Sequence, residues 1–296
     1  MTSQEVVNAL RAITLDNCLE EDIFNLYGSM GQVGNIIAKY HPGQKNAPPN
    51  CFVRATVYDP KQETITHLSR LSYPPLKYSK SYQRASSPCR PMFYATRLRD
   101  FIPKNILNAQ KTCLRETIAD PTELYTTEKR VAISLWHTTM QLDLLAVFSW
   151  EDFQVNNTEM QEVNQGFNAF IQQSSPEIQN STKLIYDYIG ERFSVPVNAN
   201  QWEYLPSAIF THFILMSFRF NLHRELHGIV FPSTKVKGSE LNVALLPGVV
   251  DKGLRCTSVI DCRFNEDGTV QFKKQGSVND DGSLNFNESM DFRLAL

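Results

Sequence analysis

Residues 51–58 read CFVRATVY, a stretch in which apolar and polar side chains alternate. A period of two is typical of a half-buried strand, with one face against a core. Two later runs, VAISLW (131–136) and LDLLAVF (142–148), are rich in β-branched, aromatic and other apolar residues and predict further strands. We therefore expect a central sheet, built around the strand at 51–58.

Helical patterns lie on both sides of these strands. Thr2 and Glu5 have the spacing of a capping box, and Asn17 and Glu20 repeat it, so the first forty or so residues are predicted to be helical. Later helices are expected at 160–171, at 183–193 and from Pro206 to about residue 226. Further strands are expected at 228–231, 241–246 and 257–264, followed by edge strands that turn at two Asp-Gly pairs, 267–268 and 281–282.

The order of these elements indicates an α+β protein with a mixed, mostly antiparallel central sheet and flanking helices. Residues 41–50, HPGQKNAPPN, favour turns and interrupt helix hydrogen bonding, so they predict a boundary. We expect a helical N-terminal extension over residues 1–48 and the main domain over residues 49–296.

Composition excludes several classes of protein. The 29 basic and 31 acidic residues nearly cancel, and the pI of about 6.3 gives no electrostatic reason to expect a nucleic-acid partner. The first residues do not resemble a secretory signal, and the most apolar window, 209–220, is too short to cross a bilayer. We expect a cytoplasmic protein that acts on a small molecule, with no membrane partner.

Neither cysteines nor histidines form a metal motif. The six cysteines include no C-x-x-C pair, so reduced thiols are expected instead of disulfides or a zinc site. His223 and His227 are four residues apart on the expected helix end, but Glu225 is placed differently from the glutamate of H-E-x-x-H. No metal is therefore predicted.

Four segments stand out because of their residue types and their order in the chain. They are HLSRLSYPP (67–75), QRASSPCRPMFYAT (83–96), CLRETIA (113–119) and HGIVFPSTK (227–235), and LNVALL follows the last of them. Together they resemble the RES-domain family, which is named for its arginine, glutamate and serine. The resemblance covers residues 66–246, about three fifths of the chain.

The chain departs from the family pattern at three positions. Gln83 stands where the family often has glycine, Ser86 where it often has asparagine, and Phe231 where tyrosine is usual before Pro-Ser. Glutamine would be strained at Gln83 if that turn required a positive φ, which glycine accepts.

The resemblance implies a fold like that of ADP-ribosyltransferases and a toxin that degrades NAD by cleaving its nicotinamide–ribose bond, through hydrolysis or phosphorolysis. Arg70 and Arg84 would bind the pyrophosphate through planar forks of donors. Glu116 would hold the ribose and stabilise the oxocarbenium-like transition state. Tyr94 would stack on the nicotinamide, and Ser233 would hydrogen-bond the substrate. The expected catalytic residues are Glu116, Arg70 and Ser233, with Arg70, Arg84, Tyr94 and Ser233 binding NAD as substrate.

Each of these residues also has a structural explanation: salt-bridged arginines, a core tyrosine, a solvated glutamate and a turn-forming serine. His67 and Asn242 are fainter candidates for the site. Two other functions stay open, an ADP-ribosyltransferase with a macromolecular acceptor and a non-catalytic interaction protein that keeps the fold. A toxin of this kind implies an antitoxin or immunity partner, and the sequence leaves homo-oligomer formation open.

Overall fold

The computed structural model describes residues 1–14, 18–43, 49–118, 126–149, 158–196, 200–236 and 240–295. The chain forms an α+β fold with mixed, mostly antiparallel strands, as the sequence predicts. Two compact units are each assembled from three stretches of chain. The first unit is Met1–Lys39, Pro75–Met92 and Leu142–Leu246, and the second unit is Tyr40–Pro74, Phe93–Gln141 and Pro247–Leu296.

The first unit contains most of the helices. They are α1 (Ser3–Ala12), α2 (Glu20–Gly28), α5 (Thr158–Gln173), α6 (Pro176–Phe193) and α7 (Leu205–Asn221), with short 3₁₀ helices η2 (Leu76–Tyr78) and η4 (Gln201–Tyr204). Its strands are β1 (Ile37–Tyr40), β5 (Leu142–Ala146), β6 (Gly228–Pro232) and β7 (Leu241–Leu245), in the order β1-β5-β6-β7. β5 and β6 run parallel, whereas β6 and β7 run antiparallel.

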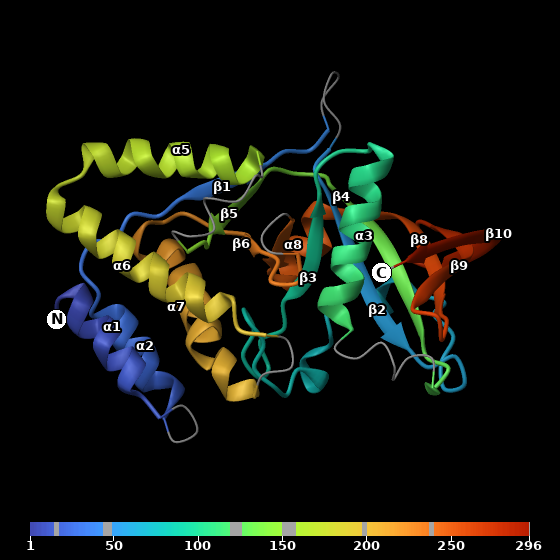
Figure 1. Cartoon of the computed structure of the whole chain (residues 1–296), viewed down its shortest axis with the longest axis horizontal. Helices are drawn as coiled ribbons and strands as arrows, with labels where there is room; N and C mark the ends of the chain where they lie inside the picture. Colours follow the sequence, from blue (N-terminus) through green and yellow to red (C-terminus); the bar gives the residue numbers. More distant parts are fainter. Residues whose placement is uncertain are drawn as a thin grey trace. The chain divides into compact units, whose positions relative to one another are not determined.

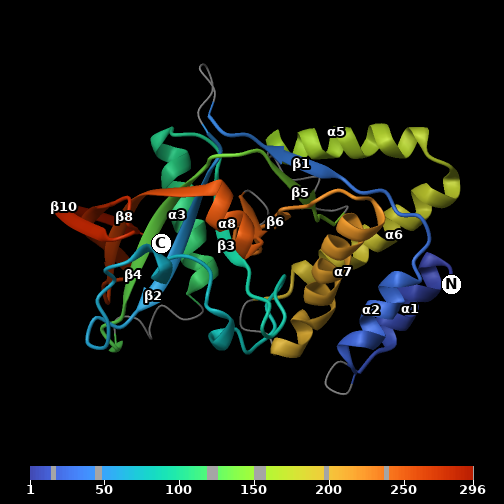
Figure 2. The same cartoon turned by 180° about the vertical axis from the view of Figure 1, so that it is seen from behind.

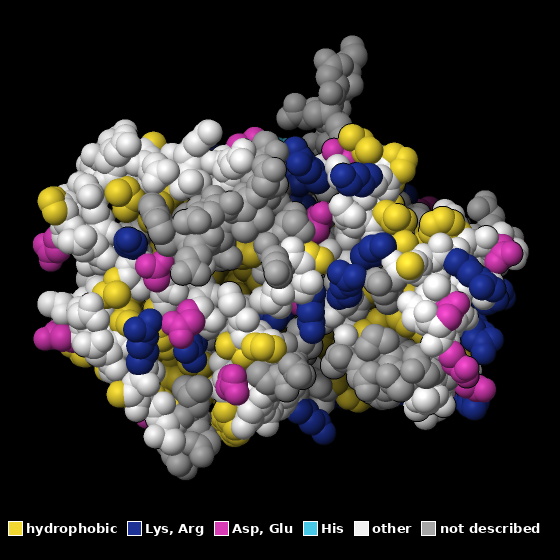
Figure 3. All heavy atoms as spheres, in the orientation of Figure 1, with side chains coloured by type: hydrophobic (Ala, Val, Ile, Leu, Met, Phe, Trp, Pro, Cys, Tyr) yellow, Lys and Arg dark blue, Asp and Glu magenta, His cyan; other side chains and the backbone are white. Residues whose placement is uncertain are grey.

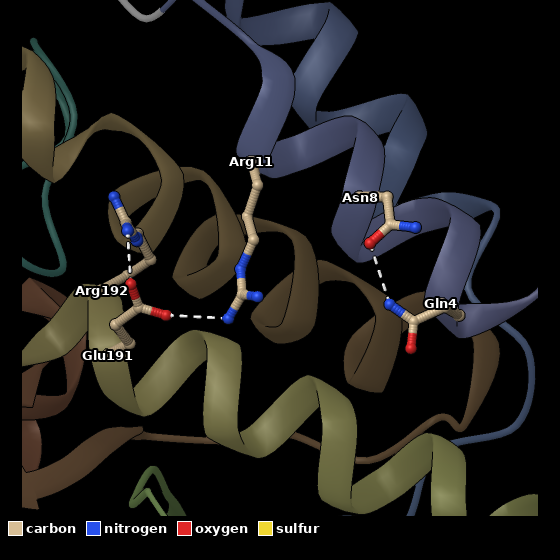
Figure 4. A network of polar contacts seen from close by, with 5 residues as sticks. All are labelled: Gln4, Asn8, Arg11, Glu191 and Arg192. Carbon is tan, nitrogen blue, oxygen red and sulfur yellow. Dashed lines mark hydrogen bonds and ion pairs between the residues drawn. The ribbon is translucent and has the colours of Figure 1, made fainter.

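The two N-terminal helices pack on α6 and α7 (Figures 1 and 2). Arg11 on α1 pairs with Glu191 on α6 at 3.1 Å (Figure 4), and the Tyr27 hydroxyl donates to the Pro206 carbonyl at 3.0 Å. The buried side chains at this contact include Val6, Val7, Leu10 and Ile23. α1 and α2 therefore belong to the core of the first unit; a separate functional role for residues 1–48 stays a prediction.

The N-terminal segment begins as a helix, as its sequence predicts, but ends as a strand. The capping box at Thr2 and Glu5 is confirmed, since each donates its backbone N–H to the other's side chain. Asn17 lies outside the described residues, and α2 begins at Glu20. The prediction of helix up to about residue 40 is wrong at its end, because 37–40 form β1, next to β5 in the sheet.

The second unit is mainly an antiparallel sheet in the order β3-β2-β4-β8-β9-β10. Its strands are β2 (Cys51–Tyr58), β3 (Phe93–Leu98), β4 (Arg130–Thr138), β8 (Leu254–Phe264), β9 (Thr269–Val278) and β10 (Leu284–Ala295), and it also contains η1 (Leu68–Arg70), α3 (Pro103–Thr117) and α8 (Pro247–Gly253). The strand predicted from CFVRATVY is confirmed residue for residue. Gly268 and Gly282 have φ values of 77° and 82°, as the predicted Asp-Gly turns require.

One helix, α3, covers one face of this sheet and closes its core. Its residues Ala109, Cys113 and Leu114 pack with Val53 and Ala55 of β2. Leu98, Val131, Ile133 and Phe272 belong to the same cluster. α3 therefore holds any side chain near its C-terminal end in a fixed place relative to β2 and β3.

No described helix is long and apolar enough to span a bilayer. All six cysteines are free thiols, and only Cys89 is exposed. Burial raises the pKa of Cys51 and of Cys256 to about 12, and it raises the pKa of Cys113 and Cys262 as well.

Iodoacetamide at pH 8 should modify Cys89 first, because the thiolate is the nucleophile and the other thiols are less exposed. Cys51, Cys113, Cys256 and Cys262 should react only after unfolding. Peptide mass spectrometry over time checks this order. Early labelling of any buried thiol in the folded protein would contradict the described core.

Substitution of Gly190 on α6 should be costly, because a Cβ there would lie 2.6 Å from the Cα of Ser149. We expect Gly190→Ala to lower the free energy of unfolding by about 1–3 kcal/mol, the cost of overpacking. Gly166→Ala on α5 is the matched control, since its Cβ would meet nothing within 4 Å and should stabilise the helix by about 0.5–1 kcal/mol. Urea denaturation measures both, and equal effects would refute the close approach at Gly190.

Candidate functional site

The predicted site residues fall into two groups. Arg84 and Ser233 belong to the first unit, whereas Arg70, Tyr94 and Glu116 belong to the second unit.

Arg84 lies in a tight turn whose ends are joined by two backbone hydrogen bonds. Gln83 N–H donates to the Ser86 carbonyl at 2.9 Å, and Ser86 N–H donates to the Gln83 carbonyl at 3.2 Å. Among the described non-glycine residues, positive φ occurs at Cys89, Glu128 and His223 but not at Gln83. Glutamine is therefore unstrained in this turn, and the departure from the family's glycine carries no backbone cost.

The Arg84 side chain is buried and bridges distant parts of the first unit. Its Nη2 donates to the Val195 carbonyl at 2.8 Å and to Thr234 Oγ1 at 2.9 Å. The guanidinium carbon lies 6.0 Å from the centre of the Tyr204 ring. Thr234 is 150 residues from Arg84 in sequence, so folding joins two of the four segments on which the resemblance rests.

Ser233 follows directly after β6 and is buried. Its hydroxyl oxygen accepts a hydrogen bond from the Lys235 N–H at 3.2 Å, and its own N–H donates to the Glu240 carbonyl at 2.9 Å. These contacts form the turn that presents Thr234 to Arg84. Asn242, the fainter candidate, lies on β7 opposite Phe231 and is also buried.

Arg70 already holds a carboxylate in the second unit. Its Nε and Nη2 donate to the two oxygens of Glu63 at 2.8 and 2.7 Å, and Nη2 also donates to the Val57 carbonyl at 3.2 Å. The hydrogen bond from Arg70 lowers the pKa of Glu63. The guanidinium thus makes two parallel hydrogen bonds to a carboxylate, and it would bind a phosphate with the same geometry. A phosphate bound at Arg70 would therefore replace Glu63.

Arg54 on β2 joins two of the predicted segments and was missed from the sequence. Its Nε donates to the carbonyl of Leu71, the residue after Arg70, at 3.1 Å, and its Nη1 donates to the Tyr94 carbonyl at 2.6 Å. The guanidinium lies 5.1 Å from the centre of the Phe93 ring. Burial lowers the pKa of Arg54 to about 10. The signal available in sequence was that Arg54 is the one charged residue of this strand.

Strand geometry explains how Arg54 reaches Tyr94. β2 pairs with β3 from Cys51 opposite Leu98 to Val53 opposite Thr96. Arg54 is the next residue along β2, and its side chain donates a hydrogen bond to the backbone carbonyl of Tyr94 on β3. The Arg54 side chain therefore links the segment that carries Arg70 to the strand that carries Tyr94.

Tyr94 and Glu116 share one side of the sheet. Tyr94 is four residues before Leu98, which packs under α3, so the two point to the same face of β3. Glu116 is half-buried in the last turn of α3. Burial raises the pKa of the Cys113 thiol. The positive charge of Arg54 lowers this pKa and the negative charge of Glu116 raises it, so Arg54 and Glu116 both lie near the thiol.

The histidines have structural contacts. The prediction that α7 extends to about residue 226 is wrong, because the helix ends at Asn221 and both His223 and His227 lie beyond it. His227 Nδ1 accepts the Asp143 N–H at 2.8 Å, and His67 Nε2 lies 3.2 Å from the Asp281 carbonyl oxygen. In the described stretches of the chain, no three His, Cys, Asp or Glu side chains are grouped as metal ligands would be.

Comparison with known proteins adds no further identification. A scan against family models, a search of curated proteins and a search of solved structures each return no match.

The contact between Arg84 and Thr234 should be detectable as an energetic coupling. We expect Arg84→Met to lower the free energy of unfolding by about 1.5–3 kcal/mol, because two acceptors lose a charged donor. Thr234→Val, which removes a single acceptor, should lower it by about 1 kcal/mol. The double variant should lose about 1 kcal/mol less than the sum, as neighbours that share a hydrogen bond do. Urea denaturation of the four proteins measures the coupling, and strict additivity would show that the segments do not touch.

Proposed function

We propose that this protein degrades NAD by cleaving the bond between nicotinamide and ribose, on a fold like that of ADP-ribosyltransferases. The observation that carries the proposal is the contact between Arg84 and Thr234, beside Ser233. Arg84 and Ser233, which the resemblance assigns to the same substrate, lie in two segments far apart in sequence, and this contact joins those two segments within the first unit.

Arg84 is suited to hold the pyrophosphate. The Val195 carbonyl and the Thr234 hydroxyl accept hydrogen bonds from its guanidinium and orient it. A buried, oriented guanidinium binds phosphate oxygens more strongly than a solvated one, since low dielectric strengthens the attraction. The Tyr204 ring beside it offers an apolar face to a nucleotide.

Ser233 takes a positioning role in this proposal. Its hydroxyl already accepts from the Lys235 N–H and maintains the turn around Thr234. A serine hydroxyl can still donate its proton to a substrate oxygen while it accepts from the backbone. It need not act as a nucleophile, because the cationic nicotinamide leaves as a neutral molecule while the ribose develops positive charge.

Glu116 supplies the negative charge of the reaction in this proposal. Cleavage develops positive charge on the ribose, and a carboxylate carried by a helix packed on the sheet would stabilise that charge. Tyr94, positioned by Arg54 through its carbonyl, would stack on the nicotinamide ring. Water, phosphate or a macromolecule could accept the ADP-ribose, which corresponds to hydrolysis, phosphorolysis or transfer.

Partners and location follow from this chemistry. An NAD-degrading enzyme depletes its host, so the proposal includes an antitoxin or immunity protein and a cytoplasmic location, where NAD is abundant.

One observation favours a second function, a non-catalytic interaction protein that keeps the fold. Arg70 donates both arms of its fork to Glu63 and so already has an anionic partner. A protein in which this pair is permanent would lack one of the two expected phosphate contacts.

Purified protein should consume NAD, with or without phosphate as acceptor. Glu116→Gln keeps the shape and removes the charge, so we expect NAD loss to slow about a hundredfold or more, the usual effect of removing one transition-state contact. Glu162→Gln, an exposed glutamate on α5, is the control and should leave the rate unchanged. Chromatography of nicotinamide and ADP-ribose products measures the rate and identifies the acceptor.

Two results would decide against this function. Stable NAD with folded, inhibitor-free protein, together with retained NAD binding, would favour the interaction protein. Equal loss of activity in both variants would show that Glu116 has no special role.

A further inference from the structure

The outward face of α3 carries a row of positive charges. Lys104, Lys111 and Arg115 are seven and four residues apart, which places them within about 40° of one another around a helix of 3.6 residues per turn. Ala109 and Cys113, on the opposite side, are buried against the sheet. Figure 3 shows dark blue side chains along the face where Figure 1 draws α3.

These charges are not neutralised within the described part of the chain. Lys104, Lys111 and Arg115 form no ion pair or side-chain hydrogen bond with any described residue. The nearby carboxylate of Asp100 binds other groups: its Oδ1 accepts hydrogen bonds from the Ile102 N–H at 2.9 Å and from the Asn105 side-chain amide at 2.8 Å. Its charge thus stays at the start of the helix.

Two exposed apolar side chains lie just before the N-terminal end of α3. Phe101 and Ile102, which directly precede α3, are 42% and 57% exposed. The Phe101 ring lies 5.8 Å from the His137 ring, so one side of it is supported while another faces solvent. Yellow apolar side chains lie beside the blue ones near this end of the helix in Figure 3. We call Phe101, Ile102, Lys104, Lys111 and Arg115 the basic face.

We propose that the basic face is a docking site for an acidic polypeptide segment that carries one apolar anchor. A partner helix with carboxylates spaced like these cations would meet all three over about 17 Å. Its apolar residue would pack on Ile102 and Phe101 and fix the direction of the segment, whereas the charges would set partner choice. This surface consists of α3 and the two residues before it, and it does not depend on NAD cleavage.

The charge pattern fits a polypeptide better than a nucleic acid. Affinity for nucleic acid grows with the number of phosphates neutralised, and three cations on a chain of net charge −2 provide few. A single supported aromatic ring also provides less stacking surface than single-strand binding uses. An aliphatic side chain, Ile102, is the more exposed of the two apolar residues.

The probe for this proposal is a fluorescein-labelled helical peptide of about 14 residues, with leucine near one end and glutamates at spacings of seven and four. Fluorescence anisotropy with the full-length chain should show saturable binding that weakens with salt. The variant Lys104→Glu/Lys111→Glu/Arg115→Glu should weaken it at least about tenfold, as the loss of several steering charges does. Ile102→Ser should weaken it as well.

A matched control changes three other exposed cations, Lys77, Lys80 and Arg219, to glutamate, so net charge falls equally. This control should bind the peptide within about twofold of the parent, because only bulk charge has changed. If the reversed variant fails to fold by circular dichroism, the triple glutamine variant replaces it. Three results would overturn the proposal. The parent protein could fail to bind the peptide, or both triple variants could lose peptide affinity equally. The basic face could also bind a single-stranded oligonucleotide in preference to the peptide.

Discussion

Hydrogen bonding of a buried guanidinium to backbone carbonyls is the interaction on which both groups of predicted site residues depend. Arg54 binds the carbonyls of Leu71 and Tyr94 in the second unit, and Arg84 binds that of Val195 in the first. Removing a charge from water is costly unless hydrogen bonds compensate for the lost solvation. The chain segments that supply these acceptors are therefore held in place, and the candidate substrate contacts with them.

Local patterns were sufficient for much of the fold. Alternation in CFVRATVY predicted β2 at its observed ends, and Asp-Gly pairs predicted the turns that flank β9. Patterns failed where tertiary contact overrides propensity. β1 lies beside β5, more than a hundred residues later, and α7 ends early because His223 adopts φ 50° after a helix that is apolar almost throughout. Nor could periodicity show that each unit draws on three separate stretches.

The candidate site was partly predictable because its residue types are unusual in their local context. Arg84 and the Pro-Ser-Thr turn were found through the order of motifs, and their contact could be known only from the fold. Arg54 was missed because an arginine in a half-buried strand is ordinarily assigned to the solvent face. Glu63, which pairs with Arg70 from seven residues away, lies in a polar loop that gives no periodic signal.

The Arg70–Glu63 pair is compatible with phosphate binding on energetic grounds. Its side chains are 44% and 35% exposed, and pairs of this kind contribute only about 0–1 kcal/mol. A pyrophosphate oxygen pair presents the same geometry to the guanidinium with more negative charge, so exchange would recover the hydrogen bonds that Glu63 gives up. Glu63 would then return to water, where a carboxylate is well solvated. The pair thus orients the Arg70 side chain in advance, which would lower the ordering cost of binding a phosphate there.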